Sequence, residues 1–314
     1  MIQLKQRQYG NTGKQVSEIG FGAWQLGNRQ DWAAMGDEDA IALVHQALER
    51  GVNFFDTAPN YGLGRSETLL GIALAGKRSK TVINTKFGHG ADGTTNYDPS
   101  SIRISVEQSL RRLRTDYVDS VLIHNPPFDH LDGKLGHFEI FSQLKQEGKL
   151  LAYGASVDSS KEMLELIQHT EVNVIEVLFN IFAQETAEAF QLAKEKNIAL
   201  IVKIPLDSGW LSGKYNAQST FEGVRKRWSP ETIAKRAALV DKIRFISDEQ
   251  TSMTTAALRF ILAYPEIATV IPGTRNIAQL NENVAASDAP MPQDQVRQLQ
   301  ELWDQEIRFQ NLGW

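Results

Sequence analysis

The feature of this sequence that most limits its fold is a unit that recurs eight times: a short apolar run, a loop and an amphipathic helical pattern. The runs are apolar at nearly every position, which is typical of parallel strands covered on both faces. Strands that alternate with helices predict parallel strands joined by crossover connections. The predicted strands lie at 19–24, 52–55, 81–86, 120–124, 152–156, 174–179, 198–204 and 268–271.

Each predicted strand is followed by a predicted helix. These helices span 39–50, 66–75, 101–113, 138–147, 160–169, 185–196, 251–263 and 277–287, and an extra helix at 293–305 follows them. Eight such units favour an α/β fold of the (β/α)8 TIM-barrel type, with residues 1–314 as a single domain. A doubly wound open sheet is the alternative, because periodicity does not reveal whether a sheet closes on itself.

The composition limits the class of protein. The 314 residues carry a formal net charge of −5 and 42% of them are hydrophobic, an ordinary globular balance that argues against a general nucleic-acid partner. The absence of cysteine excludes disulfides, thiolate metal sites and a cysteine nucleophile. The N-terminus lacks the apolar core of a signal peptide and no apolar run is long enough to cross a membrane, so we expect a cytoplasmic protein without a membrane partner.

Polar residues with reactive side chains stand where several apolar runs end. Asp56 ends the second run with Tyr61 on the loop behind it, Lys86 ends the third run, and His124 ends the fourth. In a parallel barrel these ends surround one opening, so residues far apart in the sequence can meet there. Each residue alone has a plain structural explanation, such as a cap or a turn, and only the set indicates chemistry.

The four side chains together suit proton transfer to a carbonyl oxygen. Tyrosine is a poor acid near neutral pH, because its reference pKa is about 10. A Lys86 ammonium held in place by Asp56 is expected to lower the pKa of Tyr61. His124 is expected to donate a hydrogen bond to the carbonyl and orient it. Such a site suits carbonyl reduction with hydride supplied by a cofactor.

The motifs that contain these residues resemble those of the aldo-keto reductase family, in the same order and with the same spacing over nearly the whole chain. They are FDTAPNYG, VINTKFG, LIHNP, IPLDSGWLSGK and IPGTRNIAQLNEN. The resemblance implies a barrel that binds a nicotinamide cofactor, usually NADPH, and reduces aldehydes, ketones or sugars. It also implies Tyr61 as general acid-base, Lys86 and Asp56 as the pair that tunes it, and His124 as the residue that orients the substrate.

The resemblance further implies the cofactor contacts. Many relatives carry an arginine where this chain has Gln279, and Arg275 is expected to replace it at the 2′-phosphate, so NADP is favoured over NAD. A helix that starts near Ile277 would add N–H groups that favour an anion. Plain packing explains Leu206 and Leu211 equally well. The implied contacts are Gly273, Thr274, Arg275, Gln279, Glu282 and Asn283 near the adenosine phosphate, and Leu206, Ser208, Gly209, Leu211 and Lys214 near the pyrophosphate.

Three positions near the expected nicotinamide depart from the family pattern. A Ser-Asn pair is usual where this chain has Ser156 and Val157, so one amide contact is missing. Glu176 stands in place of a glutamine, and a carboxylate accepts hydrogen bonds but does not donate them. Lys203 stands where a tyrosine often stacks on the nicotinamide, and its charge is expected near the cofactor phosphates instead. Ser156, Glu176 and Lys203 nevertheless remain predicted cofactor contacts.

Trp24, Asn60 and Asn125 are predicted to face the substrate. Trp24 closes the first strand, and the two asparagines flank the predicted acid and orienting residue, where they can reach substrate hydroxyls or serve turn geometry. Further candidates for aromatic walls, for which packing or a place at the rim is the commoner explanation, are Trp210, Trp228 and Trp314.

Two motifs favour bland interpretations. A literal GxGxxG at 88–93 is followed by a polar loop, whereas a dinucleotide-binding Rossmann unit needs this motif to open a helix. We therefore interpret it as a loop beside the active site. The basic cluster Arg225, Lys226 and Arg227 is interpreted as a solvated loop or helix start.

Two other functions stay open. An aldolase would use Lys86 as a Schiff-base nucleophile, which requires a neutral amine that Asp56 would oppose. A barrel that binds the cofactor but serves as a regulatory or sensor subunit would keep the fold with little turnover. A metal-dependent hydrolase is disfavoured and no metal site is predicted, because only His124 stands at a strand end and the sequence has no His-x-His pair.

Overall fold

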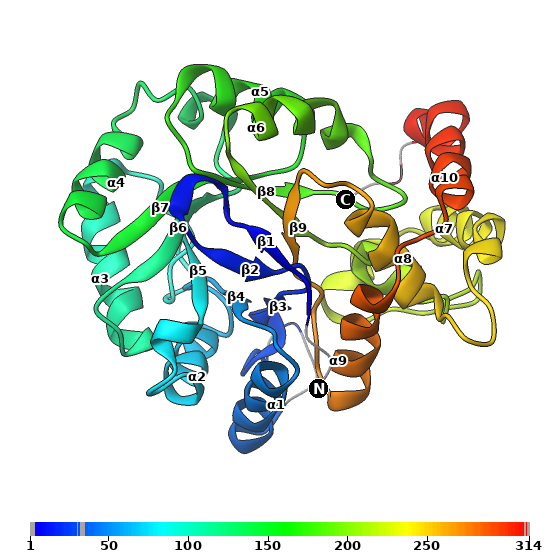
Figure 1. Ribbon diagram of the computed structural model, residues 1–314, viewed down its shortest axis with the longest axis horizontal. Coiled ribbons are helices and arrows are strands. Elements are labelled where there is room, and N and C mark those ends of the chain that lie inside the picture. Colours follow the sequence, from blue (N-terminus) through cyan, green and yellow to red (C-terminus); the bar gives the residue numbers. More distant parts are fainter. Residues whose placement is uncertain (1–3, 30, 32–34, 311, 313–314) are drawn as a thin grey trace.

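The computed structural model describes residues 4–29, 31, 35–310 and 312 (Figure 1). Its main sheet has eight parallel strands, each paired with the next along the chain. All eight predicted strands are confirmed, with the first one shortened. They are β3 (Phe21–Gly22), β4 (Phe54–Asp56), β5 (Val82–Phe87), β6 (Val118–His124), β7 (Leu150–Val157), β8 (Val174–Leu178), β9 (Ala199–Lys203) and β10 (Ile267–Val270).

The sheet closes into a barrel between β3 and β10. Parallel bridges join Ile19 to Val270 and Gly22 to Gly273. The close approach of β3 to the segment after β10 requires a residue without a side chain, because a Cβ on Gly22 would lie 2.8 Å from the carbonyl oxygen of Ile271. The predicted (β/α)8 barrel is therefore confirmed, and the open doubly wound sheet is excluded.

Helices surround the barrel (Figure 1). Every predicted helix has a counterpart, whereas α7 was not predicted, because it is inserted between β9 and α8 and breaks the pattern of one helix per strand. It begins with Ser229 as N-cap and Pro230 in its first turn. The helices are α1 (Asp37–Glu49), α2 (Arg65–Ala73), α3 (Ile102–Leu113), α4 (His137–Gln146), α5 (Ser160–His169), α6 (Phe190–Glu195), α7 (Pro230–Lys242), α8 (Met253–Leu262), α9 (Ile277–Val284) and α10 (Gln293–Gln305).

Membrane insertion finds no support in the helices. Within the described ranges, none of them combines the length and the apolar character that crossing a bilayer requires.

A β-hairpin that the sequence did not predict covers the amino-terminal end of the barrel (Figure 1). Its strands β1 (Gln6–Gln8) and β2 (Gln15–Ser17) pair in antiparallel fashion. Tyr9 between them is fully buried, and its hydroxyl forms a 2.7 Å hydrogen bond with Ser120 Oγ. Gly10 has φ +55°, and a Cβ there would lie 2.8 Å from the backbone nitrogen of Ala199. Within the described residues, the hairpin thus leaves the carboxyl ends of the strands as the opening of the barrel.

Strand alternation explains how polar side chains come to share the barrel interior. Phe54, Val82, Leu122, Val174 and Ile201 fill the barrel beside the hairpin in one buried cluster with Tyr9. Side chains two residues apart on a strand point to the same face. The inward positions nearer the opening are therefore Asp56, Asn84, Lys86, His124, Ser156, Glu176 and Lys203.

Candidate active site

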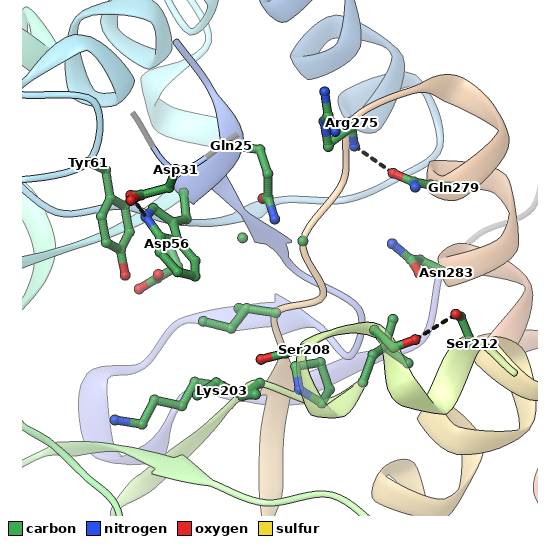
Figure 2. Close-up of a pocket in the computed structure, with 18 of the residues that line it drawn as sticks. Gln25, Asp31, Asp56, Tyr61, Lys203, Ser208, Ser212, Arg275, Gln279 and Asn283 are labelled. Atoms are coloured by element: carbon green, nitrogen blue, oxygen red, sulfur yellow. Dashed lines mark hydrogen bonds between the residues drawn. The ribbon is translucent and has the colours of Figure 1, made fainter. Parts of the chain in front are cut away.

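A cavity of about 690 Å³ opens at the carboxyl ends of the strands. Figure 2 shows Asp56 and Tyr61 on one side of it and Arg275, Gln279 and Asn283 on the other. Polar atoms on its walls are buried without a hydrogen-bond partner in the described part of the chain, and they include Gln25 Oε1, Asn60 Oδ1 and His124 Nδ1. Because buried polar atoms are rarely left unpaired, these walls suit a polar ligand.

Lys86 is buried between two carboxylates. Its Nζ lies 2.7 Å from both carboxylate oxygens of Asp56, 3.2 Å from the carbonyl oxygen of Thr57 and 3.2 Å from Glu176 Oε2. Burial alone would lower the pKa of Lys86, but the negative charges of Asp56 and Glu176 outweigh it and raise that pKa above its usual value. Lys86 is therefore an ammonium, which is the opposite of what a Schiff-base aldolase requires.

Asp56 is a weaker acid than an ordinary aspartate. Burial, and after it the charge of Glu176, raises the pKa of Asp56 to about 7, against the opposing effect of Lys86. Asn84 Nδ2 donates a further hydrogen bond to Asp56 Oδ2 at 2.7 Å. Two carboxylates that face one ammonium carry a net negative charge inside the protein unless they share a proton.

Tyr61 lies next to both Lys86 and His124. Its ring centroid is 5.3 Å from Lys86 Nζ and 5.9 Å from the His124 ring, which stands edge-on to it. Burial raises the pKa of Tyr61 above its ordinary value and outweighs the lowering by Lys86, while Asp56 and Glu176 raise it further. The expectation of a lowered tyrosine pKa is therefore wrong as a net effect. Burial destabilises the Tyr61 phenolate by more than its attraction to the partly neutralised Lys86 ammonium stabilises it.

His124 is a neutral imidazole. Burial first, and then the positive charge of Lys86, lowers the pKa of His124 well below its usual value. The ring of His89 packs perpendicular to that of His124 at 5.0 Å, and the Tyr97 hydroxyl donates to the backbone carbonyl of His124 at 2.7 Å. His89 belongs to the GxGxxG segment, which precedes no helix before Pro99. The interpretation of that motif as a loop beside this site is confirmed.

Ser156 and Lys203 extend the network of polar contacts from Glu176 in the direction away from Lys86. Ser156 Oγ lies 3.0 Å from Glu176 Oε1. Lys203 Nζ donates to Ser156 Oγ at 2.8 Å and to Asn125 Oδ1 at 2.6 Å, and it pairs with Asp158 at 2.8 Å. Lys203 points away from Arg275 in Figure 2, so its charge does not lie where the expected phosphate contacts gather. Asp158 and Asn125 account for this direction, because the Asp158 carboxylate compensates the charge and the Asn125 amide oxygen accepts a hydrogen bond.

The opposite side of the cavity is built from the start of α9 and the loop after β9. Asn276 caps α9, the backbone N–H of Arg275 donates to Gln279 Oε1 at 2.9 Å, and Asn283 Nδ2 donates to Thr274 Oγ1 at 3.1 Å. Of the predicted contacts in these two segments, Thr274 and Leu211 are buried and do not line the cavity, and those that line it are Leu206, Ser208, Gly209, Lys214, Gly273, Arg275, Gln279, Glu282 and Asn283.

Comparison with known proteins agrees with the barrel. The sequence model of the aldo/keto reductase family matches residues 18–304. The chain belongs to this family. It is therefore an oxidoreductase of the class that uses nicotinamide cofactors, and the predicted family membership is confirmed.

Relatives of this aldo-keto reductase match it almost end to end. L-galactose dehydrogenase of Arabidopsis thaliana is 31% identical over 295 residues, which are 91% of this chain and 89% of the relative. The NADH-specific methylglyoxal reductase of Escherichia coli (strain K12) is 30% identical over 90% of this chain and 93% of its own. The holo structure of an aldo-keto reductase from Bacillus halodurans superposes with a TM-score of 0.80 at 28% identity, covering 95% of this chain and 96% of that one.

The predicted substrate residues of the aldo-keto reductase, Trp24, Asn60 and Asn125, all line the cavity. The rings of Trp24 and Tyr61 are 6.1 Å apart, and Trp24 Nε1 donates to Asp31 at 3.2 Å. Trp210 and Trp228 are buried and pack against each other, so they are core residues and form no wall. Trp314 lies outside the described residues.

Several residues that line the cavity of the reductase were not predicted from the sequence. Arg225 and Arg227 line the cavity from the 3-10 turn Gly223–Arg227. Lys226 and Arg227 are exposed, as interpreted from the sequence, whereas Arg225 is half-buried. Arg225 Nη1 donates to the Tyr215 hydroxyl at 2.7 Å, which anchors it over the loop. The position of Arg225 after the seventh strand could have indicated a cavity residue, because the loops that follow barrel strands form the mouth. The other unpredicted lining residues include Gln25, Asp31, Ser212 and Thr254.

A buried ion pair fixes the loop after β9. Asp207, at the start of the 3-10 turn Asp207–Ser212, pairs with Arg236 of α7. Arg236 Nη2 also donates to the carbonyl oxygen of Leu312 at 3.2 Å. Ile204, Asp207 and Ser208 have φ of 53°, 45° and 54°, a left-handed conformation that only strong anchoring maintains in residues with side chains. The unpredicted helix α7 thus helps to shape the cavity.

Proposed function

We propose that this protein reduces the carbonyl group of a small aldehyde, ketone or sugar, or oxidises the corresponding alcohol, with NADPH as its cofactor. The observation that carries the proposal is the Tyr61 phenol on the cavity wall beside the Lys86 ammonium and the neutral His124 imidazole. The phenol retains its proton because burial raises its pKa, so it can act as an acid.

Each member of the set has a distinct role in the proposed reaction. The bound cofactor supplies hydride to the carbonyl carbon. Tyr61 gives its proton to the carbonyl oxygen, which would otherwise carry the negative charge. Lys86, oriented by Asp56, stabilises the phenolate that remains. His124 is neutral, so one ring nitrogen can donate a hydrogen bond to the carbonyl oxygen without adding a second buried cation.

The remaining residues are proposed to hold the two ligands. Arg275, Gln279 and Asn283 suit the phosphate of the adenosine, and the Ser208–Gly209 turn suits the pyrophosphate, because a backbone without a side chain allows close approach. Trp24, Asn60 and Asn125 are proposed to contact the substrate. Arg275 favours NADPH, although a relative is named for NADH specificity and cofactor choice therefore varies among such proteins. The cytoplasmic location remains a prediction.

The proposal is tested with the purified protein. NADPH and NADH are titrated by fluorescence, and a panel of aldehydes, ketones and sugars is then added while the absorbance of the reduced cofactor is followed. Tyr61→Phe is expected to lower turnover by about 10²–10⁴-fold and to leave the cofactor Kd unchanged, since only the acidic proton is lost. Tyr117→Phe, which lies beside Arg78 on the barrel exterior and outside the cavity lining, is the control.

Each result has a defined meaning. Turnover that disappears in Tyr61→Phe supports the reductase. Cofactor binding without turnover on any carbonyl compound favours a regulatory or sensor barrel. Failure to bind either cofactor, or full activity of Tyr61→Phe, would contradict the assignment of the site.

A further inference from the structure

The Lys86 ammonium faces two carboxylates, although one would be enough to neutralise its charge. Asp56 on β4 and Glu176 on β8 approach it from two sides, at 2.7 Å and 3.2 Å, and both carboxylate side chains are at most 3% exposed. An isolated pair with Asp56 would be neutral, whereas the triad is anionic if both carboxylates are ionised. A buried net charge is costly, and a proton shared by the two carboxylates removes that cost.

The triad is also connected to solvent by a continuous series of polar contacts. Glu176 Oε1 meets Ser156 Oγ at 3.0 Å, and Ser156 Oγ accepts from Lys203 Nζ at 2.8 Å. Lys203 Nζ pairs at 2.8 Å with Asp158, whose side chain is 55% exposed. Every step is within hydrogen-bonding or ion-pair distance, so a proton can travel from the surface to Lys86 along side chains, of which Glu176 and Lys203 also line the cavity.

We propose that the Asp56–Glu176 pair stores the proton that Tyr61 loses in each turnover, and that Ser156 and Lys203 refill the pair from solvent at Asp158. The inference rests on the proposed role of Tyr61 as the acid. Glu176, Ser156 and Lys203 act through Lys86, so they are positioning residues and not members of the reacting set.

The transfers balance. Reduction leaves a Tyr61 phenolate, to which Lys86 gives one proton while it takes the stored proton from the carboxyl pair. Both carboxyl groups are then ionised. Glu176 Oε1 next takes a proton from the Ser156 hydroxyl as that hydroxyl takes one from the Lys203 ammonium, and the Lys203 amine is recharged by a solvent acid at Asp158. One solvent proton is consumed per carbonyl, and every relay group returns to its starting state.

The surroundings of the pair support storage near neutral pH. The titratable groups that interact with it are Lys86 on β5, Tyr61 and the buried Tyr9, with Asn84 as a neutral donor to Asp56. Lys203 on β9 reaches the pair through Ser156, and His124 on β6 interacts with Lys86. Burial and the charge of Glu176 raise the pKa of Asp56 to about 7, so the pair is partly protonated at that pH. Asp56 and Glu176 themselves line the cavity, so the stored proton lies at the wall between the cavity and the buried Lys86.

The first experiment needs neither cofactor nor substrate. Infrared spectra of the protein are recorded as a function of pH, and the C=O stretch of protonated carboxyl groups is followed. Ordinary carboxyls lose this band near pH 4. We expect part of the band to persist to about pH 7, and Glu176→Gln and Asp56→Asn each to remove that part. A wild-type band that vanishes completely with the ordinary carboxyls would overturn the proposal.

The second experiment times the proton. In a single turnover followed by stopped flow, a pH indicator reports proton uptake and absorbance reports NADPH oxidation. Uptake is expected to lag behind oxidation in the wild type. Ser156→Ala is expected to lengthen that lag by about 10²-fold. Ser156→Thr keeps a hydroxyl, so its lag is expected to equal that of the wild type. Uptake that coincides with oxidation in the wild type, or equal lags in the Ala and Thr variants, would refute the relay.

The two proposals fail in different ways. If none of the carbonyl compounds causes the wild type to oxidise NADPH, the proposed function fails. The infrared titration still tests the stored proton in that case. If turnover is normal and the wild-type band and lag are both absent, only the storage proposal fails. The wild-type measurements give this answer even if Glu176→Gln does not fold, and circular dichroism identifies that case.

Discussion

Asp207 and Arg236 form an ion pair in which each side chain is only 1% exposed. The pair connects the cavity loop after β9 to α7. Arg236→Met leaves the Asp207 carboxylate buried without its counter-charge, so we expect the free energy of unfolding to fall by about 3–5 kcal/mol. Urea denaturation measures the change. Lys235→Met, which breaks an exposed pair with Glu231, is the control and should cost less than about 1 kcal/mol.

The double variant Asp207→Leu/Arg236→Met separates the two contributions. Replacing both partners removes the unpaired charge, and apolar replacements of buried ion pairs are often nearly neutral. We therefore expect the double variant to be more stable than Arg236→Met alone. If it is equally unstable, the loss comes from packing and from the contact with Leu312, and the ion pair is not its cause.

The stability of the protein should carry a pH signature from Asp56. Its pKa rises from 3.8 to about 7 on folding, because of burial and then Glu176. Between these values the folded state binds the proton more tightly than the unfolded chain, so the Asp56 contribution to stability falls as pH rises through the window. Glu176→Gln removes the neighbouring charge and should gain more stability, relative to wild type, at pH 8 than at pH 5. Equal differences in urea denaturation at both pH values would contradict the assignment.

Arg275 is expected to govern cofactor choice. Loss of a charge-assisted hydrogen bond to a phosphate costs about 1.5–3 kcal/mol, so Arg275→Met should raise the NADPH Kd by roughly 10- to 150-fold and change the NADH Kd much less. Fluorescence titration of both cofactors measures the two constants. Arg297→Met on the exposed face of α10 should change neither. Equal weakening of both cofactors would mean that Arg275 does not contact the 2′-phosphate.

Gly154 should tolerate no side chain. It pairs with Val174 across β7 and β8, and a Cβ there would lie 1.7 Å from the Val174 carbonyl oxygen. Gly154→Ala must therefore push the two strands apart, at an expected cost of about 3 kcal/mol or more. Gly148 has open space around its Cβ position but φ +74°, so Gly148→Ala should cost only about 1–2 kcal/mol of backbone strain. Thermal denaturation of both variants compares the two effects.

Much of the fold could be predicted because each barrel strand buries both faces and reads as a continuous apolar run. The β1–β2 hairpin lacked this signal. Its three-residue strands are mostly polar, and only Tyr9 and Val16 enter the barrel. Helix α7 was missed for a different reason, because its sequence is helical but the count of one helix per strand left no place for it.

The proximity of the predicted side chains could be inferred from the sequence, whereas their pKa values could not. Asp56, Tyr61, Lys86 and His124 were found because reactive residues at strand ends stand out against apolar runs. The raised pKa of Tyr61 depends on how completely its hydroxyl is buried and on the approach of Glu176 from β8. Arg225 became a wall residue only through the path of its loop. Such properties arise from three-dimensional contacts that no spacing in the sequence records.

The hairpin at the amino-terminal end gives the barrel one entrance. Tyr9 and Gly10 pack against the strands there, so the described barrel has no second opening behind Asp56 and Lys86. Any two molecules that share the cavity therefore arrive and depart through the same mouth, one after the other. A product that is slow to leave therefore occupies the route that the next molecule needs.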